Sequence, residues 1–206
     1  MIPWLLCLAA YGLGATPTSF WVGKARGVDL RNEGSGNLGA TNAFRVLGWQ
    51  AALVVMVVDV LKGWFPVWYF PRLDGGAAWG WTLAYGAAAI VGHVFSFWVR
   101  FRGGKGVATS GGVFIALAPL AALGGFVVWL GMVALTRIVS VGSIAAALAL
   151  PVLVAVTVPT AGTGLVAFTV GLSAFVIWKH RSNLTRLFRG EEPRIGQKRP
   201  AARAAS

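Results

Sequence analysis

Residues 48–70 read GWQAALVVMVVDVLKGWFPVWYF. Only Asp59 and Lys62 within this run carry a charge, and Gly48 and Pro71 bound it. A helix needs about 20 predominantly apolar residues to cross the hydrocarbon core of a bilayer. The stretch therefore predicts a transmembrane helix over about residues 48–70. Because Asp59 and Lys62 stand three residues apart on that helix, we interpret them as a structural ion pair in preference to a proton relay.

The composition of the whole chain agrees with a membrane protein. Of the 206 residues, 57% are hydrophobic and only 12% are charged, whereas a soluble domain carries about 25% charged residues. Cys7 is the sole cysteine, which excludes an intrachain disulfide and a cysteine-based metal site. The first basic residue is Lys24, so the N-terminus lacks the positive region of a signal peptide and predicts an uncleaved first helix. We expect one all-α integral membrane domain.

Further apolar runs predict the other spans. They cover about residues 2–23, 77–99, 141–158 and 161–178. Residues 106–135 are long for one helix and short for two. We split this stretch near Pro119 into a short fourth helix and a fifth helix. Two crossings are needed there if the basic residues on either side of the stretch are to lie on the same face of the membrane. The fourth helix, over 106–118, would span only about 20 Å, less than the core of the bilayer.

The basic residues fix the expected orientation. With two crossings between Lys105 and Arg137, 16 of the 18 basic residues lie on one side, which the positive-inside tendency assigns to the cytoplasm. The prediction is seven transmembrane helices with the N-terminus outside and the C-terminus cytoplasmic. Five or six spans would result if 106–135 formed one helix or a re-entrant pair. We expect a catalytic domain over 1–190 and a basic, disordered cytoplasmic tail over 191–206.

The net charge of +12 indicates anionic lipid at that face. No basic helix or aromatic platform for nucleic acid accompanies the charge, so nucleic acid is not expected as a partner.

Residues 34–45 read GSGNLGATNAFR and interrupt the apolar pattern. Exposed backbone polar groups are too costly in hydrocarbon, so this segment must lie at the membrane surface or line a protected cavity. Glycines allow N–H groups to converge, short polar side chains add hydrogen bonds, and Arg45 contributes a fixed positive charge. The segment is typical of an anion site, although a plain turn would also fit its glycines.

Three further polar segments fall on the same predicted face. They cover residues 92–109, 136–143 and 179–187. The second contains GGKG at 103–106, which lacks Walker spacing and the following Ser or Thr and is therefore no nucleotide P-loop. His93 is as compatible with packing as with binding. His180 is better placed, because Asn183 lies one turn away on the same helical face.

Glycine loops, hydroxyls, amides and basic groups outnumber carboxylates in these segments, which favours phosphate or carboxylate ligands over metals or cations. Ser140 and Ser143 also stand one turn apart, but serines in membrane helices often bond only to backbone. Several mechanisms lack their residues. No Cys/His/Asp metal set is present, neither histidine begins a His-x4-Asp pair, and no paired aspartates of the CDP-alcohol phosphotransferase type occur.

The ordered set of motifs resembles the bacterial membrane acyl-phosphate:glycerol-3-phosphate acyltransferases. The matching stretches are GSGNLGATN at 34–42 with Arg45, Asp59 with Lys62-Gly63, Gly92-His93 with GGKGVAT at 103–109, Arg137 with Ser140 and Ser143, and His180-Arg181-Asn183 with Arg186-Leu187. Each motif is weak alone, but the set follows the family order over nearly the whole chain. Ile138 stands where the family often has tyrosine, a mild departure.

The resemblance implies a multi-pass enzyme of the bacterial cytoplasmic (inner) membrane whose active site faces the cytoplasm. The implied reaction transfers a fatty acyl group from acyl phosphate to the 1-position of glycerol 3-phosphate. Its products are 1-acyl-glycerol 3-phosphate (lysophosphatidic acid) and inorganic phosphate. It begins phospholipid synthesis and needs no metal or cofactor. Membrane lipid would surround the enzyme.

The resemblance also implies roles for residues of this chain. The catalytic residues would be His180, Asn183, Lys105, Arg45 and Ser35. Residues contacting substrate would be Gly36, Asn37, Leu38, Gly39, Ala40, Thr41, Asn42, His93, Gly103, Gly104, Gly106, Ser140 and Ser143. We expect the 36–42 loop to cradle the donor phosphate, and Ser143 is favoured over Ser140 as the ligand serine for glycerol 3-phosphate.

Two alternatives remain open at this point. Either His180 or a substrate phosphate takes the proton of the attacking hydroxyl. A transporter or channel for a small phosphate-bearing anion would also contain glycine-rich breaks and basic groups, although no repeated half is evident in the chain. A structural subunit that binds anionic lipid would explain the charge but not the polar motifs.

Overall fold

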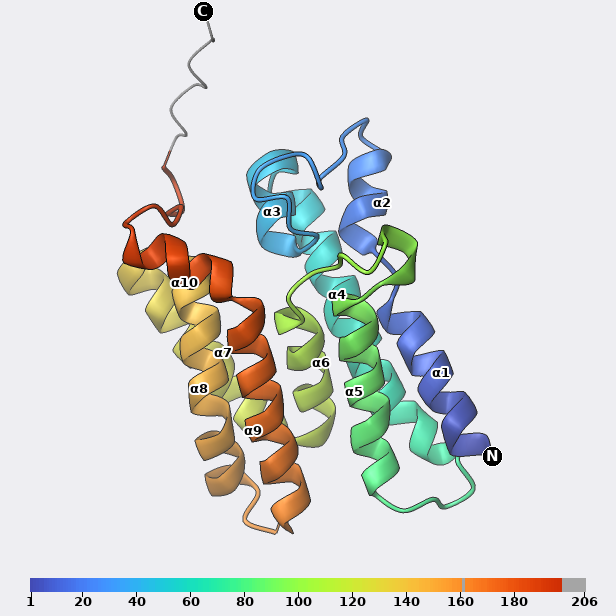
Figure 1. The fold of residues 1–206 in the computed structure, drawn as a ribbon. Helices are drawn as coiled ribbons and strands as arrows, with labels where there is room; N and C mark the ends of the chain where they lie inside the picture. Colours follow the sequence, from blue (N-terminus) through green and yellow to red (C-terminus); the bar gives the residue numbers. More distant parts are fainter. Residues whose placement is uncertain (161, 198–206) are drawn as a thin grey trace, which may run out of the picture.

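A computed structural model describes residues 1–160 and 162–197, and every regular element in those ranges is helical (Figure 1). The elements are α1 (Ile2–Gly14), α2 (Thr18–Lys24), α3 (Ala40–Leu47), α4 (Trp49–Tyr69), η1 (Phe70–Arg72), α5 (Gly80–Val94), η2 (Phe97–Val99), α6 (Val107–Leu117), α7 (Pro119–Thr136), α8 (Val139–Thr157), α9 (Gly162–Lys179) and α10 (Arg181–Phe188). The all-α prediction is confirmed for this part of the chain.

Six segments within the described residues are long and apolar enough to cross a membrane. They are Ile2–Lys24, Trp49–Arg72, Gly80–Val99, Pro119–Thr136, Val139–Thr157 and Gly162–Lys179. Each corresponds to a predicted span to within a few residues. A seventh apolar helix, Val107–Leu117, is shorter.

The predicted division of 106–135 is present. The backbone of Ala118 is not helical (φ −151°, ψ 74°), and Pro119 begins α7. Proline suits the first position of a helix because it has no N–H group to leave unpaired there. At about 1.5 Å per residue, the 11 residues of α6 extend only about 16 Å. This length is well short of the roughly 30 Å hydrocarbon core of a bilayer.

The first span is interrupted where the sequence predicted one continuous run. The first helix ends at Gly14 and the next begins at Thr18, because Pro17 has no N–H group and disfavours helical geometry in the residue before it. The freed carbonyls have partners elsewhere. Lys62 Nζ donates to Thr16 O over 2.8 Å, and Ser96 Oγ donates to Ala15 O. Such replacement partners are what allow a break at membrane depth.

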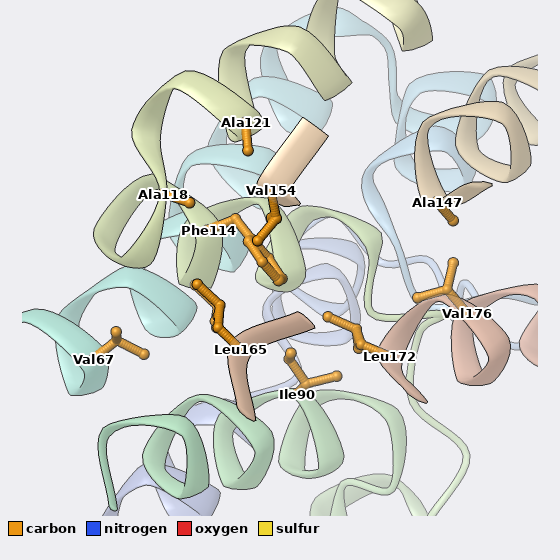
Figure 2. Packing of buried hydrophobic residues seen from close by; sticks show 11 residues of the cluster. Val67, Ile90, Phe114, Ala118, Ala121, Ala147, Val154, Leu165, Leu172 and Val176 are labelled. Atoms are coloured by element: carbon orange, nitrogen blue, oxygen red, sulfur yellow. The ribbon is translucent and has the colours of Figure 1, made fainter. Parts of the chain in front are cut away.

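The helices pack in close pairs, α1 with α5, α4 with α6, and α7 with α8. Glycine permits the α4–α6 approach, since a Cβ on Gly63 would collide with Thr109 O and a Cβ on Gly112 with Val60 O. Figure 2 shows the apolar core, in which side chains from α4 to α9 meet. Its labelled members are Val67, Ile90, Phe114, Ala118, Ala121, Ala147, Val154, Leu165, Leu172 and Val176.

The topology gathers the polar segments at one end. In Figure 1, α2, α3, the connection between α5 and α6, and α10 lie at the upper end of the molecule. The N-terminus, the α4–α5 connection and the α8–α9 connection lie at the lower end. Three of the four polar segments singled out in the sequence therefore share one end of the helical bundle. The fourth, 136–143, joins them there, because Ser140 Oγ donates to Glu192 and Arg137 O accepts the N–H of Ile195.

Candidate active site

The first glycine-rich segment is folded around the side chain of Asn42. Its Oδ1 accepts the N–H of Ser35 over 2.8 Å. Its Nδ2 donates to Leu30 O over 3.1 Å and to Glu33 O over 3.0 Å. Asn42 is 1% exposed, so this amide shapes the loop from inside.

Glycine is required at the start of this loop. Gly34 and Gly36 have φ of +62° and +68°, a conformation that side-chain-bearing residues rarely adopt. The loop then runs into α3, whose N-cap is the extended residue Gly39. Free N–H groups at the start of a helix, together with its dipole, attract anions. The segment thus has the local geometry expected of a phosphate-binding loop.

The second glycine-rich segment folds back onto the end of α5. The N–H of Gly103 donates to Val94 O over 3.0 Å, and that of Gly104 to His93 O over 3.2 Å. Gly106 has φ +87° and leads into α6. A Cβ on Gly104 would lie 2.7 Å from Leu38 O and would collide with the ring of His93. The two glycine loops therefore meet at Gly104, where only glycine fits.

Lys105 connects this loop to the far side of the site. Its ammonium group donates to Asn183 Oδ1 on α10. Asn183 Nδ2 in turn donates to Glu192 Oε1 over 2.5 Å. The same carboxylate accepts Ser140 Oγ over 2.7 Å and pairs with Arg186 Nε over 2.7 Å. A polar network thus joins the beginning of α6, α8, α10 and the segment that follows α10.

Glu192 is the residue that the sequence analysis missed. It was assigned to a disordered tail beginning at residue 191, yet it is 6% exposed and accepts hydrogen bonds from three side chains. The N–H of Ile195 also donates to Arg137 O. Glu192 and the backbone of Ile195 therefore contact the helical domain, and 198–206 lie outside the described residues. Arg186 was part of the resemblance but had been given no role.

Charge and burial set the proton affinity of the site. Burial lowers the pKa of Lys105 from 10.5 to about 8, against the attraction of Glu192 and in concert with Arg186, Arg45 and Lys179. Burial opposes ionisation of Glu192, but hydrogen bonds from Asn183, Ser140 and Arg186 bring its pKa below its usual value. The site contains a buried carboxylate within an excess of positive charge, which favours an anionic ligand.

His180 lies at the junction of α9 and α10 and is 3% exposed. Burial first, and then the charge of Lys105, lower its pKa from 6.5 to about 4, so the ring is neutral near pH 7. Its Nδ1 lies 2.8 Å from Val176 O. A carbonyl can only accept a hydrogen bond, so we assign the proton to Nδ1, which leaves Nε2 as an acceptor.

The remaining predicted residues are of two kinds: exposed residues at the surface of the first loop, and buried or partly buried residues. Ser35 and Arg45 are exposed on the side of the first loop, and Arg45 is close enough to influence Lys105 electrostatically. Ser143 is buried and its Oγ donates to Val139 O over 3.0 Å. His93 lies beneath the second loop, with Nδ1 3.7 Å from Asp59 Oδ1. Leu38 is buried, while Thr41 is partly buried at the start of α3.

Among the described residues no group of three or more His, Cys, Asp and Glu side chains is placed to hold a metal ion.

Several known proteins are similar to this chain in sequence, and their names describe the same activity. The sequence profile described as glycerol-3-phosphate acyltransferase matches residues 4–190. A protein of that name from Synechococcus elongatus is 45% identical, with 94% of each chain covered. One from Geobacter sulfurreducens is 44% identical, with 93% of this chain and 96% of the relative covered.

Two crystal structures are similar along almost the whole chain. Both are of PlsY (YgiH), an integral membrane glycerol 3-phosphate acyltransferase. The glycerol 3-phosphate form is 37% identical, with a TM-score of 0.88 over 94% of this chain and 96% of that one. The lysophosphatidic acid form is 36% identical, with a TM-score of 0.85 over 94% and 95%. On this evidence, the chain belongs to the glycerol-3-phosphate acyltransferase family.

Proposed function

We propose that this chain transfers a fatty acyl group from acyl phosphate to the 1-position of glycerol 3-phosphate. The products are 1-acyl-glycerol 3-phosphate and inorganic phosphate. Acyl transfer to glycerol 3-phosphate rests on the family and on the two related structures, whose names contain that acceptor and the lysophosphatidic acid product. The observation that carries the proposal further is the meeting of two glycine loops at Gly104, because both proposed substrates bear a phosphate.

The acceptor site is proposed around Lys105. Its ammonium group, the exposed Arg45 and the hydroxyl of Ser35 would hold the phosphate of glycerol 3-phosphate, with His180 and Asn183 at the glycerol end. Charge-assisted hydrogen bonds to phosphate are among the strongest in proteins. Ser143 remains our favoured ligand serine, since the hydroxyl of Ser140 already donates to Glu192. Ser143 donates only to a carbonyl of its own helix.

The donor site is proposed at the first loop. The backbone of residues 36–42 would surround the phosphate of the acyl phosphate at the beginning of α3. Its acyl chain would extend between helices into the membrane. This arrangement brings the activated carbonyl to the acceptor along the shared boundary of the two loops.

The reaction is an acyl transfer in which one bond forms and one breaks. The 1-hydroxyl oxygen attacks the acyl carbonyl carbon, and the carbon–oxygen bond to phosphate breaks. Phosphate leaves with the bonding electrons, and the hydroxyl proton passes to a base. Because the mixed anhydride is already activated, orientation and charge stabilisation supply much of the catalysis.

The pKa of His180, about 4, bears on the choice of base. A base with so low a pKa accepts a proton weakly near pH 7. We therefore favour a substrate phosphate as the proton acceptor, with Nε2 of His180 accepting a hydrogen bond that orients the hydroxyl. His180→Gln tests this choice: near-normal kcat with a raised KM for glycerol 3-phosphate is expected. Loss of kcat at saturating acceptor would contradict this choice and leave His180 as the candidate base.

The topology is part of the proposal. The six long spans together with Val107–Leu117 would make seven crossings, with the N-terminus outside and the active site on the cytoplasmic side of the inner membrane. The gathering of the polar segments at the end opposite the N-terminus supports this arrangement (Figure 1). Labelling of single cysteines placed at Gly76 and Ser182, in a Cys7→Ser background, from each side of sealed membranes tests it.

One assay separates the enzyme from an anion transporter. Purified protein receives acyl phosphate with and without glycerol 3-phosphate, and a parallel reaction receives acyl-CoA as donor. Phosphate release that requires glycerol 3-phosphate, together with formation of 1-acyl-glycerol 3-phosphate, is the expected result. Product formed from acyl-CoA but not from acyl phosphate would overturn the proposed donor, and no product from either would overturn acyl transfer.

A further inference from the structure

A buried group of three ionisable side chains lies inside the membrane-spanning part, next to the proposed site but outside it. Lys62 Nζ is 2.8 Å from Asp59 Oδ1, and His93 Nδ1 is 3.7 Å from the same oxygen. None of the three residues is more than 7% exposed. Ionisable groups within membrane spans cost free energy to bury, so three of them close together indicate a functional role.

This cluster holds the break in the first span. Lys62 Nζ donates to Thr16 O over 2.8 Å, and Thr18 Oγ1 donates to Asp59 Oδ1 over 3.3 Å. Both contacts join α4 to the residues around Pro17, where the helix is interrupted. The ion pair thus fixes the direction in which α2 leaves the break.

The cluster also supports the two glycine loops. The edge of the His93 ring at Nε2 lies against Gly104, and Leu38 O of the first loop lies against the same position. A polar cavity of about 10 Å³ remains between these groups, lined among others by Asp59, Lys62, His93 and Gly104. This is about the space of one water molecule. The two loops therefore lie on a closely packed cluster of polar side chains, which leaves the loops little room to move.

The position of Lys105 links this polar cluster to the proposed acceptor site. Lys105 follows Gly104 directly, and its side chain bonds to Asn183 on the opposite side of the site. His93 supports Gly104 from below, while Lys105 reaches the proposed acceptor site. A change in the height of the loop would therefore move the ammonium group relative to the first loop.

We propose that Asp59, Lys62 and His93 are positioning residues for the acyl transfer proposed above. They set the separation of the two glycine loops, and hence of the two phosphate-bearing substrates. His93, which the resemblance implied as a substrate contact, would act instead through Gly104. The ion pair suits this purpose because it has contacts on two sides. Lys62 and Asp59 bond to Thr16 and Thr18 at the break, and Asp59 also lies next to His93. Displacement of reacting groups by about 1 Å can reduce a rate by about 100-fold.

The main test removes the charges as a pair. Asp59→Asn/Lys62→Met leaves no unpaired buried charge, which is what destabilises single replacements most. The thermal midpoint in detergent and the kinetic constants per folded molecule are measured for both substrates. We expect a lower thermal midpoint, because Thr16 O loses the donor Lys62, and kcat per folded molecule lowered by about tenfold or more. A kcat within about twofold of the parent value would overturn the proposal.

A second pair of variants keeps the test decisive if the double variant does not fold. His93→Ala removes the support beneath Gly104, and His93→Gln restores most of its length and a polar end. We expect kcat to fall about tenfold or more in the alanine variant and to recover at least in part in the glutamine variant. Folded His93→Ala with unchanged kcat would overturn the proposal.

Tyr85→Phe is the matched control. Tyr85 lies on α5, like His93, and its buried hydroxyl donates to Asp74 Oδ2 over 3.1 Å at the other end of the molecule. We expect this variant to be less heat-stable and to have unchanged kcat. A fall in kcat that matches its loss of stability would make stability the explanation for every variant. If the parent protein itself fails with acyl phosphate, the donor assignment is wrong, and the same variants are then compared with the donor that supports turnover.

Discussion

Lys105 and Asn183 are joined by a hydrogen bond although they lie 78 residues apart in the chain. The bond connects the beginning of α6, and with it the glycine loops, to α10. Its acceptor is an amide oxygen, which has no formal charge, so it fixes the ammonium group while leaving the positive charge available to an anion. Asn183 is held in place from its other side by Glu192.

This relationship predicts coupled effects of substitution at the two positions. Lys105→Met should lower kcat/KM for glycerol 3-phosphate by about 10- to 150-fold, the value of a hydrogen bond to a charged group. Asn183→Ala should act in the same direction because it releases the ammonium group. The double variant should lose less than the product of the two single losses, since both variants act in part through the same ammonium group. Losses that multiply would contradict the coupling, and exposed Ser182→Ala serves as the control.

The pKa of Lys105 predicts an alkaline limit. A lysine is charged below its pKa, and burial lowers this pKa from 10.5 to about 8. The cation that binds phosphate is therefore lost as the pH rises through about 8. We expect kcat/KM for glycerol 3-phosphate, which reports the free enzyme, to fall above that pH. Lys105→Arg should move the fall to a higher pH, because guanidinium stays charged. A parent profile that stays flat to about pH 10 would be incompatible with this role.

Glu192 should be required for an ordered site. Glu192→Gln replaces an acceptor by a group with an N–H₂ end, which must face one of three donors. We expect a loss of about 1–3 kcal/mol in stability, together with a lower kcat/KM for glycerol 3-phosphate. The thermal midpoint and steady-state kinetics measure the two effects. Exposed Glu191→Gln should behave like the parent protein.

Truncation tests the same contact independently. A chain ending at residue 197 retains Glu192 and the bond from Ile195 to Arg137, so it should remain active. A chain ending at residue 190 lacks both and should lose activity. Equal activity of the two truncated chains would remove Glu192 from the site.

The fold was largely predictable because its signals are local. Apolar runs set the spans, and the basic residues on either side of 106–135 together with Pro119 divide that stretch, whereas Pro66 and Pro151 lie inside their helices. The break at Pro17 was not predicted, although proline is present there too. Apolar residues continue across it, and the break depends on Lys62 and Ser96, which supply hydrogen bonds from distant parts of the chain.

The site was predictable in its loops and not in its carboxylate. Glycine, lysine and asparagine in short polar segments have few uses inside a membrane, so Lys105 and Asn183 could be singled out from the sequence. Glu192 stands among proline and arginine in a segment whose composition is that of a solvated tail. Its burial results from three donors on α8 and α10, and no periodicity within residues 191–197 indicates them.

Adjacent glycines on α6 give the sharpest prediction about packing. A Cβ on Gly112 would collide with Val60 O on α4, and backbone cannot rotate away as a side chain can. A Cβ on Gly111 meets no atom within 4 Å. Gly112→Ala should therefore destabilise the protein by about 1–3 kcal/mol or more. Gly111→Ala should be neutral or slightly stabilising, because alanine is the better helix former.

The same pair of variants reports on the site. Because α6 begins two residues after Lys105, forcing it away from α4 should displace the ammonium group and lower kcat/KM in Gly112→Ala alone. Thermal unfolding in detergent and steady-state kinetics are measured side by side for both variants. If Gly111→Ala were as damaging as Gly112→Ala, the close approach of α4 and α6 would not be what holds Lys105 in place.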